Sequence, residues 1–133
     1  MNEGLIIAII IGISIASVPL IFAAIGELLV ERSGVLNLGV EGMMIVGALA
    51  GFVVEFHTGS SFLAVLAALL AGMAIASIFA FLTQILLTNH VATGLALTLF
   101  GLGIAAFVGR RYTEENIELI SALHIPVLSD LPI

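Results

Sequence analysis

The sequence predicts an all-α membrane protein with about four transmembrane helices, and two observations carry this prediction. Hydrophobic residues make up 62% of the 133-residue chain and charged residues only 9%. Soluble domains average about 45–50% apolar and about 25% charged residues. Long uncharged stretches also recur along the chain, and about 20 such residues cross a bilayer as a helix. A soluble fold of this length could not bury so much apolar surface, so lipid is the expected solvent.

Charge and cysteine usage exclude several other classes. The net charge is −6, with three arginines and no lysine, and a nucleic-acid binder needs a basic patch. The absence of cysteine excludes disulfides, thiolate nucleophiles and cysteine metal sites. The first residues carry no positive charge before a long apolar run, so we expect a retained membrane segment rather than a signal peptide.

The first two predicted spans cover residues 5–28 and 41–56. Pro19 falls inside the first one, and a proline kink is tolerated in lipid when neighbouring groups satisfy the freed carbonyl. The second contains Gly47 and Gly51, a GxxxG spacing that lets two helix backbones pack closely. Chance occurrence in a helix rich in Gly and Ala is the alternative explanation of this spacing.

The third and fourth predicted spans cover residues 62–87 and 91–108, and a short polar turn precedes each. The third would be roughly 39 Å long as an α-helix, which exceeds the roughly 30 Å hydrocarbon core and predicts tilting or projection. Gly72, Ala76 and Ala80 are four residues apart and would form a smooth packing face on it.

The last segment, residues 109–133, has a different character. It opens with charged residues and ends with two prolines and no helical period. We expect an extramembrane loop here. No terminal element follows it, so we expect the chain to be a truncated piece of a longer polypeptide.

Residues 27–44 combine charge and glycine between apolar runs. Gly34, Gly39 and Gly42 argue against one regular helix. We predict a helix end near 31–33, a turn or re-entrant piece near 34–39, and a new helix from about Val40. The result is a broken, glycine-rich segment near residues 32–42. Irregular backbone at membrane depth is tolerated only where it is buried in protein or lines a cavity.

The polar side chains of this segment have two interpretations each. Glu27, Glu31 and Arg32 either line a translocation path and hold a broken helix, or mark an interfacial helix end where side chains reach water. An acid at mid-bilayer costs about 2.5–3.5 kcal/mol on insertion scales, which makes it a functional candidate. Asn37 and Glu41 share a face if the backbone between them is helical. They would form a structural polar knot or contact substrate directly.

The candidate pathway or polar-knot residues are therefore drawn from this one segment. They are Glu27, Asn37, Glu41, Gly34, Gly39 and Gly42.

Nothing in the chain predicts catalysis. His57, His90 and His124 are near predicted turns and too dispersed for a metal site that the sequence could justify. No Ser/His/Asp set stands out, and no phosphate loop of the GxxxxGK[ST] type is present. We predict no catalytic residue, no metal and no cofactor, and no ATPase site in this chain.

Three stretches resemble a known family. Residues 19–48, which include Gly-Val-Leu-Asn-Leu-Gly-Val-Glu-Gly from Gly34 to Gly42, closely resemble permease subunits of bacterial ABC importers. The specific group is the one for nucleosides and simple sugars, which is related to the branched-chain amino-acid permeases. Residues 89–103 and 125–132 match as well. The resemblance covers nearly the whole chain.

The resemblance implies partners and a topology. It implies a second permease subunit, cytoplasmic ATPase subunits and an extracellular substrate-binding lipoprotein, in the plasma membrane of a bacterium. Family members are considerably longer, so the chain is expected to be the N-terminal half. An outside N-terminus with residues 109–133 outside is implied too. The positive-inside rule weakly favours the opposite, because Arg110 and Arg111 outnumber Arg32.

The resemblance predicts a permease subunit that moves nucleosides or simple sugars by alternating access. Two other kinds of protein are alternatives to this prediction. One is a small self-assembling channel or scaffold subunit that uses Glu27 or Glu41 within the bilayer. The other is an intramembrane enzyme, which lacks a recognisable catalytic set.

Overall fold

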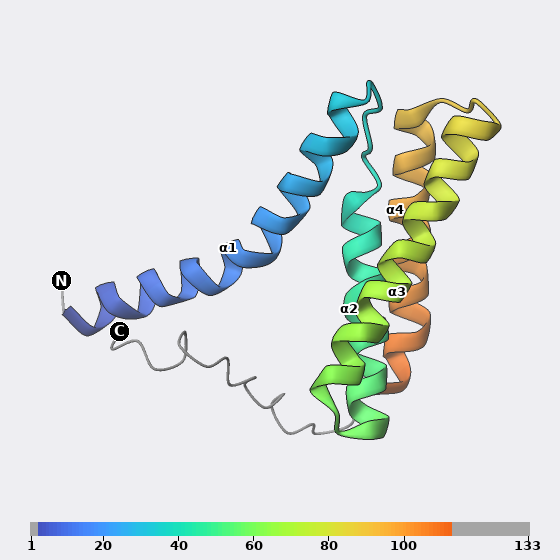
Figure 1. Ribbon diagram of the computed structural model, residues 1–133. Coiled ribbons are helices and arrows are strands. Elements are labelled where there is room, and N and C mark those ends of the chain that lie inside the picture. The colour runs from blue at the N-terminus through green and yellow to red at the C-terminus, as the bar shows by residue number, and fades with distance from the viewer. Residues whose placement is uncertain (1–2, 113–133) are drawn as a thin grey trace.

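The computed structural model describes residues 3–112, and this part of the chain is helical with no β-strand, which confirms the predicted all-α class (Figure 1). Its four long helices are each apolar and long enough to cross a membrane. They are α1 (Glu3–Arg32), α2 (Val40–Thr58), α3 (Ser61–Ala80) and α4 (His90–Gly109), with a π-helical turn at Phe81–Ile85 after α3 and a 3₁₀ turn at Arg110–Tyr112 after α4.

Helices α2, α3 and α4 form a bundle, and α1 stands away from it (Figure 1). None of the most hydrophobic window of α1 is buried within the described chain. Figure 1 also shows α1 bending along its length, and Pro19 lies inside it. Proline removes one backbone hydrogen bond and clashes with the preceding turn, which accounts for such a bend. The helix continues past residue 28, where the predicted span ended, to Arg32.

Glycines set the spacing between α2 and its neighbours. A Cβ at Gly47 would lie 3.1 Å from the Ala68 carbonyl oxygen, and a Cβ at Gly51 would lie 3.1 Å from that of Ala64. The GxxxG spacing of α2 therefore faces α3 at close range, as small residues do between membrane helices. A Cβ at Gly42 would lie only 2.6 Å from the Thr98 Cα. One face of α2 thus packs on α3 and another on α4.

The helix ends on the α2–α3 side follow local chemistry. Gly59 has φ +62° and its N–H donates to the Glu55 carbonyl, so it forms the left-handed C-cap of α2. Ser61 Oγ donates to Glu55 Oε1 at 3.2 Å across the tight connection to α3.

The passage from α3 to α4 is less regular. The Leu86 N–H donates to the Phe81 carbonyl at 3.2 Å, an i→i+5 bond that defines the π-turn. Leu87 then adopts a positive φ of 52°. Asn89 caps α4, because its side-chain oxygen accepts from the Ala92 N–H at 3.0 Å.

The small-residue face predicted on the third span does not pack on another described helix. A Cβ at Gly72 would meet nothing within 4 Å, and Ala76 and Ala80 are exposed. The span itself is also interrupted by the π-turn from Phe81. Of the predicted loop 109–133, the structure describes only Gly109 and the turn Arg110–Tyr112. His124 lies outside the described residues.

Candidate functional site

Helix α1 ends in a Schellman motif. The Val35 N–H donates to the Val30 carbonyl at 3.4 Å, and the Gly34 N–H donates to the Glu31 carbonyl at 2.9 Å. Gly34 takes φ +83° between them, the left-handed conformation that glycine adopts without steric cost. Val35 is buried beside Val30 in the apolar cluster. The sequence predicted the helix end near 31–33, and the motif explains why it falls there.

Residues 35–37 then run back as irregular chain, and Leu38 and Gly39 form a turn beside the first turns of α4 before α2 begins (Figure 1). We call residues 33–39 the crossing. Val35, Asn37 and Gly39 are buried in it. The predicted broken segment therefore exists, and alternate residues of it are buried against protein, whereas Leu36 and Leu38 are exposed.

Side chains satisfy the backbone groups that the crossing leaves unpaired. The Asn37 N–H donates to Glu27 Oε1 at 2.9 Å, and the Gly39 N–H donates to Asn37 Oδ1 at 2.9 Å. Thr98 Oγ1 donates to the Leu38 carbonyl at 3.0 Å. Buried peptide groups cost free energy unless they are paired. These three bonds supply partners from α1, the crossing itself and α4.

The crossing can approach α4 because both chains carry glycine at the contact. A Cβ at Gly94 would lie 2.8 Å from the nitrogens of Leu38 and Gly39. A Cβ at Gly39 would lie 3.0 Å from Asn37 Oδ1 and 3.3 Å from the Gly94 carbonyl oxygen. A side chain at either position would push the crossing off the helix.

Of the six predicted residues, the structure brings Glu27, Asn37 and Gly39 together, places Gly34 at the turn and sets Gly42 against α4. The condition under which Asn37 and Glu41 would share a helix face is not met. Helix α2 begins at Val40, so the backbone from Asn37 to Gly39 is not helical. Asn37 is buried, whereas Glu41 is exposed in the first turn of α2.

Glu27 is half-buried and uses only one of its two carboxyl oxygens in this arrangement. Oε1 accepts from Asn37, while Oε2 is buried with no hydrogen-bond partner in residues 3–112. A buried acceptor without a partner is costly. Glu31 and Arg32 are exposed at the end of the same helix.

Sequence reasoning missed three positions in this site. Thr98, Gly94 and Gly101 lie on one face of α4, at spacings of four and three residues. A Cβ at Gly101 would lie 2.7 Å from the Gly42 carbonyl oxygen. The spacing of small residues in α4 was a signal of close packing, but it could not identify the crossing as the partner.

A cavity of about 330 Å³ lies next to the crossing. The end of α1, the crossing and the start of α2 form one side, and the end of α3 with the π-turn forms the other. Most of its wall is apolar, including Val30 and Phe79. Asn37 and Gln84 contribute carboxamides to it.

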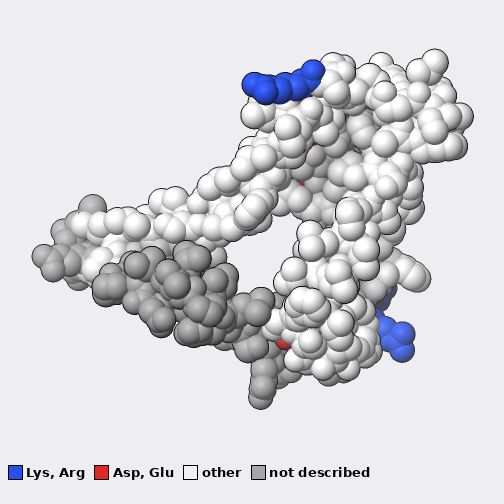
Figure 2. Space-filling model, in the orientation of Figure 1, with Lys and Arg blue, Asp and Glu red and all other residues white. Residues whose placement is uncertain are grey.

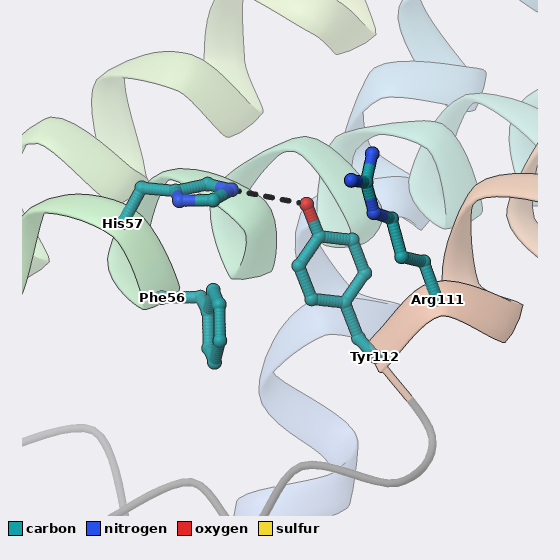
Figure 3. A pocket seen from close by; sticks show the side chains of 4 residues that line it. All are labelled: Phe56, His57, Arg111 and Tyr112. Atoms are coloured by element: carbon teal, nitrogen blue, oxygen red, sulfur yellow. Dashed lines mark hydrogen bonds between the residues drawn. The ribbon is translucent and has the colours of Figure 1, made fainter.

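A second site lies at the opposite end of the bundle, where α2 and α4 finish. A cavity of about 280 Å³ is lined by Phe56, His57, Arg111 and Tyr112 (Figure 3). The Tyr112 hydroxyl points at the His57 ring and lies 3.1 Å from Nε2. The Tyr112 ring also meets Phe52 and Phe56 edge to face, with centroid distances of 5.8 and 5.2 Å. These aromatic contacts fasten the end of α4 to α2.

Positive charge is confined to two opposite ends of the molecule (Figure 2). Arg32 ends α1, and Arg110 and Arg111 follow α4. No group of three His, Asp or Glu side chains in residues 3–112 is placed to hold a metal ion. The arrangement offers buried carboxamide and carboxylate groups beside a cavity within an apolar helical protein.

These features define a polytopic membrane protein built around a buried, non-helical crossing. The family model for the permease component of branched-chain amino acid transport systems matches residues 9–119. The chain belongs to this family. It is accordingly a multi-pass protein of the cell membrane.

Curated relatives agree with this assignment. The chain is 45% identical over 113 residues to a putative glucose ABC transporter permease of Haloferax volcanii, covering 85% of this chain and 34% of the relative. It is 33% identical over 129 residues to a nucleoside ABC transporter permease of Lactococcus lactis, covering 90% and 41%. It is 32% identical over 126 residues to a guanosine ABC transporter permease of Bacillus subtilis, covering 86% and 40%. No solved structure matches the chain.

The chain thus spans between a third and about two fifths of the length of these relatives. The family was recognised from the sequence, and residues 19–48, which carried that resemblance most strongly, fall within the matched region.

Proposed function

We propose that this chain forms part of the translocation pathway of an ABC importer for nucleosides or simple sugars. The observation that carries the proposal is the family match over residues 9–119. The names of the three relatives, a putative glucose permease, a nucleoside permease and a guanosine permease, supply the substrate range. The chain would do no covalent chemistry and would change which side of the membrane its pathway opens to.

The crossing is the part of the chain that we assign to the pathway. Non-helical backbone in membrane proteins lines cavities or is buried in protein, and the crossing does both. Discontinuous helices also form the substrate sites of many secondary transporters. Glu27, Asn37 and Gly39 would hold the crossing in place, while Gly42 fixes α2 to α4.

The importer would need other chains. A cytoplasmic ATPase would supply energy, a second permease subunit would complete the pathway, and an extracellular binding lipoprotein would deliver substrate. ATP hydrolysis is assigned to the separate subunit, because no phosphate loop of the GxxxxGK[ST] type occurs in this sequence. The N-terminus would lie outside, which puts the crossing towards the cytoplasm and the aromatic cluster towards the exterior.

The test is reconstitution of the full importer, with its partner subunits, in liposomes. We expect nucleosides or a simple sugar to stimulate ATP hydrolysis and to accumulate on the side opposite the binding protein. Asn37→Ala should reduce uptake, because it removes the acceptor of the Gly39 N–H. Gly103→Ala is the control, since a Cβ there meets nothing within 4 Å. Absence of stimulation by every nucleoside and sugar would refute the proposed function.

Orientation can be tested in the same complex, because the chain has no cysteine. Thr58 and Leu87 are exposed at opposite ends of the bundle. In intact cells, a membrane-impermeant maleimide should label Thr58→Cys and spare Leu87→Cys. The reverse pattern would place the N-terminus inside.

A further inference from the structure

The cavity beside the crossing has the properties of a ligand site rather than of a packing defect. Its volume of about 330 Å³ lies within the range of about 300–1,000 Å³ that small-molecule pockets occupy. Such pockets have mostly apolar walls and a few placed polar groups. Here the walls come from residues such as Val30, Val35 and Phe79, and the polar groups are two carboxamides and two hydroxyls.

Asn37 lines this cavity with a side chain that is held in place. The side chain is only 7% exposed. Its orientation is set because Oδ1 accepts from the Gly39 N–H at 2.9 Å. Nδ2 carries two hydrogens, and its contact in the described chain is Met43 Sδ at 3.8 Å, a weak acceptor. One buried N–H of Asn37 therefore has no partner among residues 3–112, and it belongs to a residue that lines the cavity.

Gln84 provides a second, accessible carboxamide on the facing wall. It is exposed, lines the same cavity and forms no hydrogen bond with the rest of the described chain. It lies in the π-turn Phe81–Ile85. The preceding residue, Thr83, is 1% exposed. Its hydroxyl donates a hydrogen bond to the Phe79 carbonyl at 2.8 Å, which holds the turn in place.

We infer that this cavity binds the nucleobase of a nucleoside, with Asn37 and Gln84 facing the polar edge of the base. The inference rests on the proposed import function and narrows its substrate class to nucleosides. A carboxamide offers a donor and an acceptor side by side, which matches the adjacent donor and acceptor on the edge of a base. The apolar walls suit the two flat faces of the ring, and the Met43 thioether is a favourable neighbour for an aromatic system.

A free sugar fits the same cavity poorly. Each hydroxyl of a hexose needs a partner when it leaves water. Apart from the two carboxamides, the polar side chains at the wall are Ser33 and Thr83. Both hydroxyls already donate to backbone carbonyls, Ser33 to that of Val30 and Thr83 to that of Phe79. A base with one polar edge would leave fewer groups unpaired than a ring that carries hydroxyls all round.

The experiment measures KM for uptake of labelled guanosine, adenosine, uridine, ribose and glucose by the complete importer in liposomes. Gln84→Leu removes the exposed carboxamide, and Ala80→Leu fills the cavity from its exposed wall. Ala74→Leu is the matched control, because Ala74 is exposed on the same helix and does not line the cavity. Assembly of each variant is checked by size-exclusion chromatography of the purified complex.

We expect nucleoside uptake by the wild type, and a KM raised about tenfold by Gln84→Leu, as the loss of one hydrogen bond of about 1.4 kcal/mol predicts. Ala80→Leu should raise KM at least as much, and Ala74→Leu should leave it unchanged. Purine riboside, which lacks the exocyclic group at the base edge, should compete about tenfold less well than adenosine. If Ala80→Leu does not assemble, Gln84→Leu and the competition decide.

Three results would overturn the inference. Equal KM values for Gln84→Leu and Ala74→Leu, with purine riboside as good a competitor as adenosine, would show that the base does not bind in this cavity. The proposed import function would not be contradicted by that result. Uptake of glucose or ribose without nucleosides would do the same. No uptake of any of the five solutes would overturn both the proposed function and the inference.

Discussion

The backbones of Gly42 and Thr98 are in direct contact: a Cβ at Gly42 would lie 2.6 Å from the Thr98 Cα and 2.7 Å from the Leu97 carbonyl oxygen. From the other side, a Cβ at Gly101 would lie 2.7 Å from the Gly42 carbonyl oxygen. Two glycines, one on α2 and one on α4, therefore interlock. An added Cβ would clash with backbone atoms of the facing helix, and these cannot rotate away as a side chain can.

Gly42→Ala should therefore be strongly destabilising. Separating α2 from α4 also strains the Thr98 bond to the crossing, and overpacking of this kind costs about 1–3 kcal/mol. We expect a lower midpoint of thermal unfolding for the purified complex and a lower yield of assembled protein. Gly12→Ala is the control, because a Cβ at Gly12 meets nothing within 4 Å. Equal stability of the two variants would contradict the contact.

Gly34→Ala tests the backbone of the turn rather than its packing. A Cβ at Gly34 has open space around it, yet φ is +83°. An alanine should therefore cost about 1–2 kcal/mol through the left-handed conformation alone. Gly34→Asn should be milder, because asparagine tolerates this region. The measurement is thermal unfolding of the complex, and a stable alanine variant with a destabilised asparagine variant would refute the explanation.

Glu27 should be replaceable by glutamine but not by alanine. Glutamine keeps an acceptor for the Asn37 N–H, which now bonds Glu27 Oε1 at 2.9 Å. Alanine leaves that buried N–H unpaired, at a cost of about 1–3 kcal/mol. We expect Glu27→Gln to assemble and Glu27→Ala to lose stability, both measured by thermal unfolding. Assembly of Glu27→Gln without transport would show that the charge itself is needed for function.

Thr98 holds the crossing to α4 through its hydroxyl, which donates to the Leu38 carbonyl at 3.0 Å. Thr98→Val keeps the shape of the side chain and removes the donor, so we expect a loss of about 1 kcal/mol. Thr98→Ser keeps the donor and should lose less. Protease resistance of the crossing in the assembled complex provides the measurement. A valine variant as resistant as the wild type would show that the bond contributes nothing.

The sequence predicted the position of the crossing better than its contacts. Glycines at 34 and 39 interrupt the helical pattern, and the structure breaks the helix between Arg32 and Val40. Periodicity and glycine spacing are local properties, and local properties are visible in sequence. Glu41 shows the limit of this reasoning: four residues from Asn37, it would share a face only in a helix, and residues 37–39 are not helical.

Long-range contacts were outside the reach of the sequence. Thr98 lies sixty positions from Leu38, and nothing in the residues around it specifies that carbonyl as its acceptor. The π-turn at Phe81–Ile85 was missed for a related reason. Its sequence is compatible with an α-helix, and a single residue of extra backbone leaves no compositional mark. The π-turn carries Thr83 and Gln84 at the cavity, and the Thr98 bond holds the crossing, whose Asn37 also lines it. The candidate site therefore depended most on features that could not be predicted.

Tyr112 should stabilise the far end of the bundle mainly through its ring. The ring meets Phe52, Phe56 and His57 at centroid distances of 5.8, 5.2 and 6.0 Å, and such pairs contribute about 0.5–1.5 kcal/mol each beyond area burial. The hydroxyl adds one bond to His57 at an exposed position, where water can replace it. Tyr112→Phe should therefore cost little and Tyr112→Leu should cost clearly more. Thermal unfolding of the two variants separates the contributions, and a phenylalanine variant as unstable as the leucine variant would assign the stabilisation to the His57 bond instead.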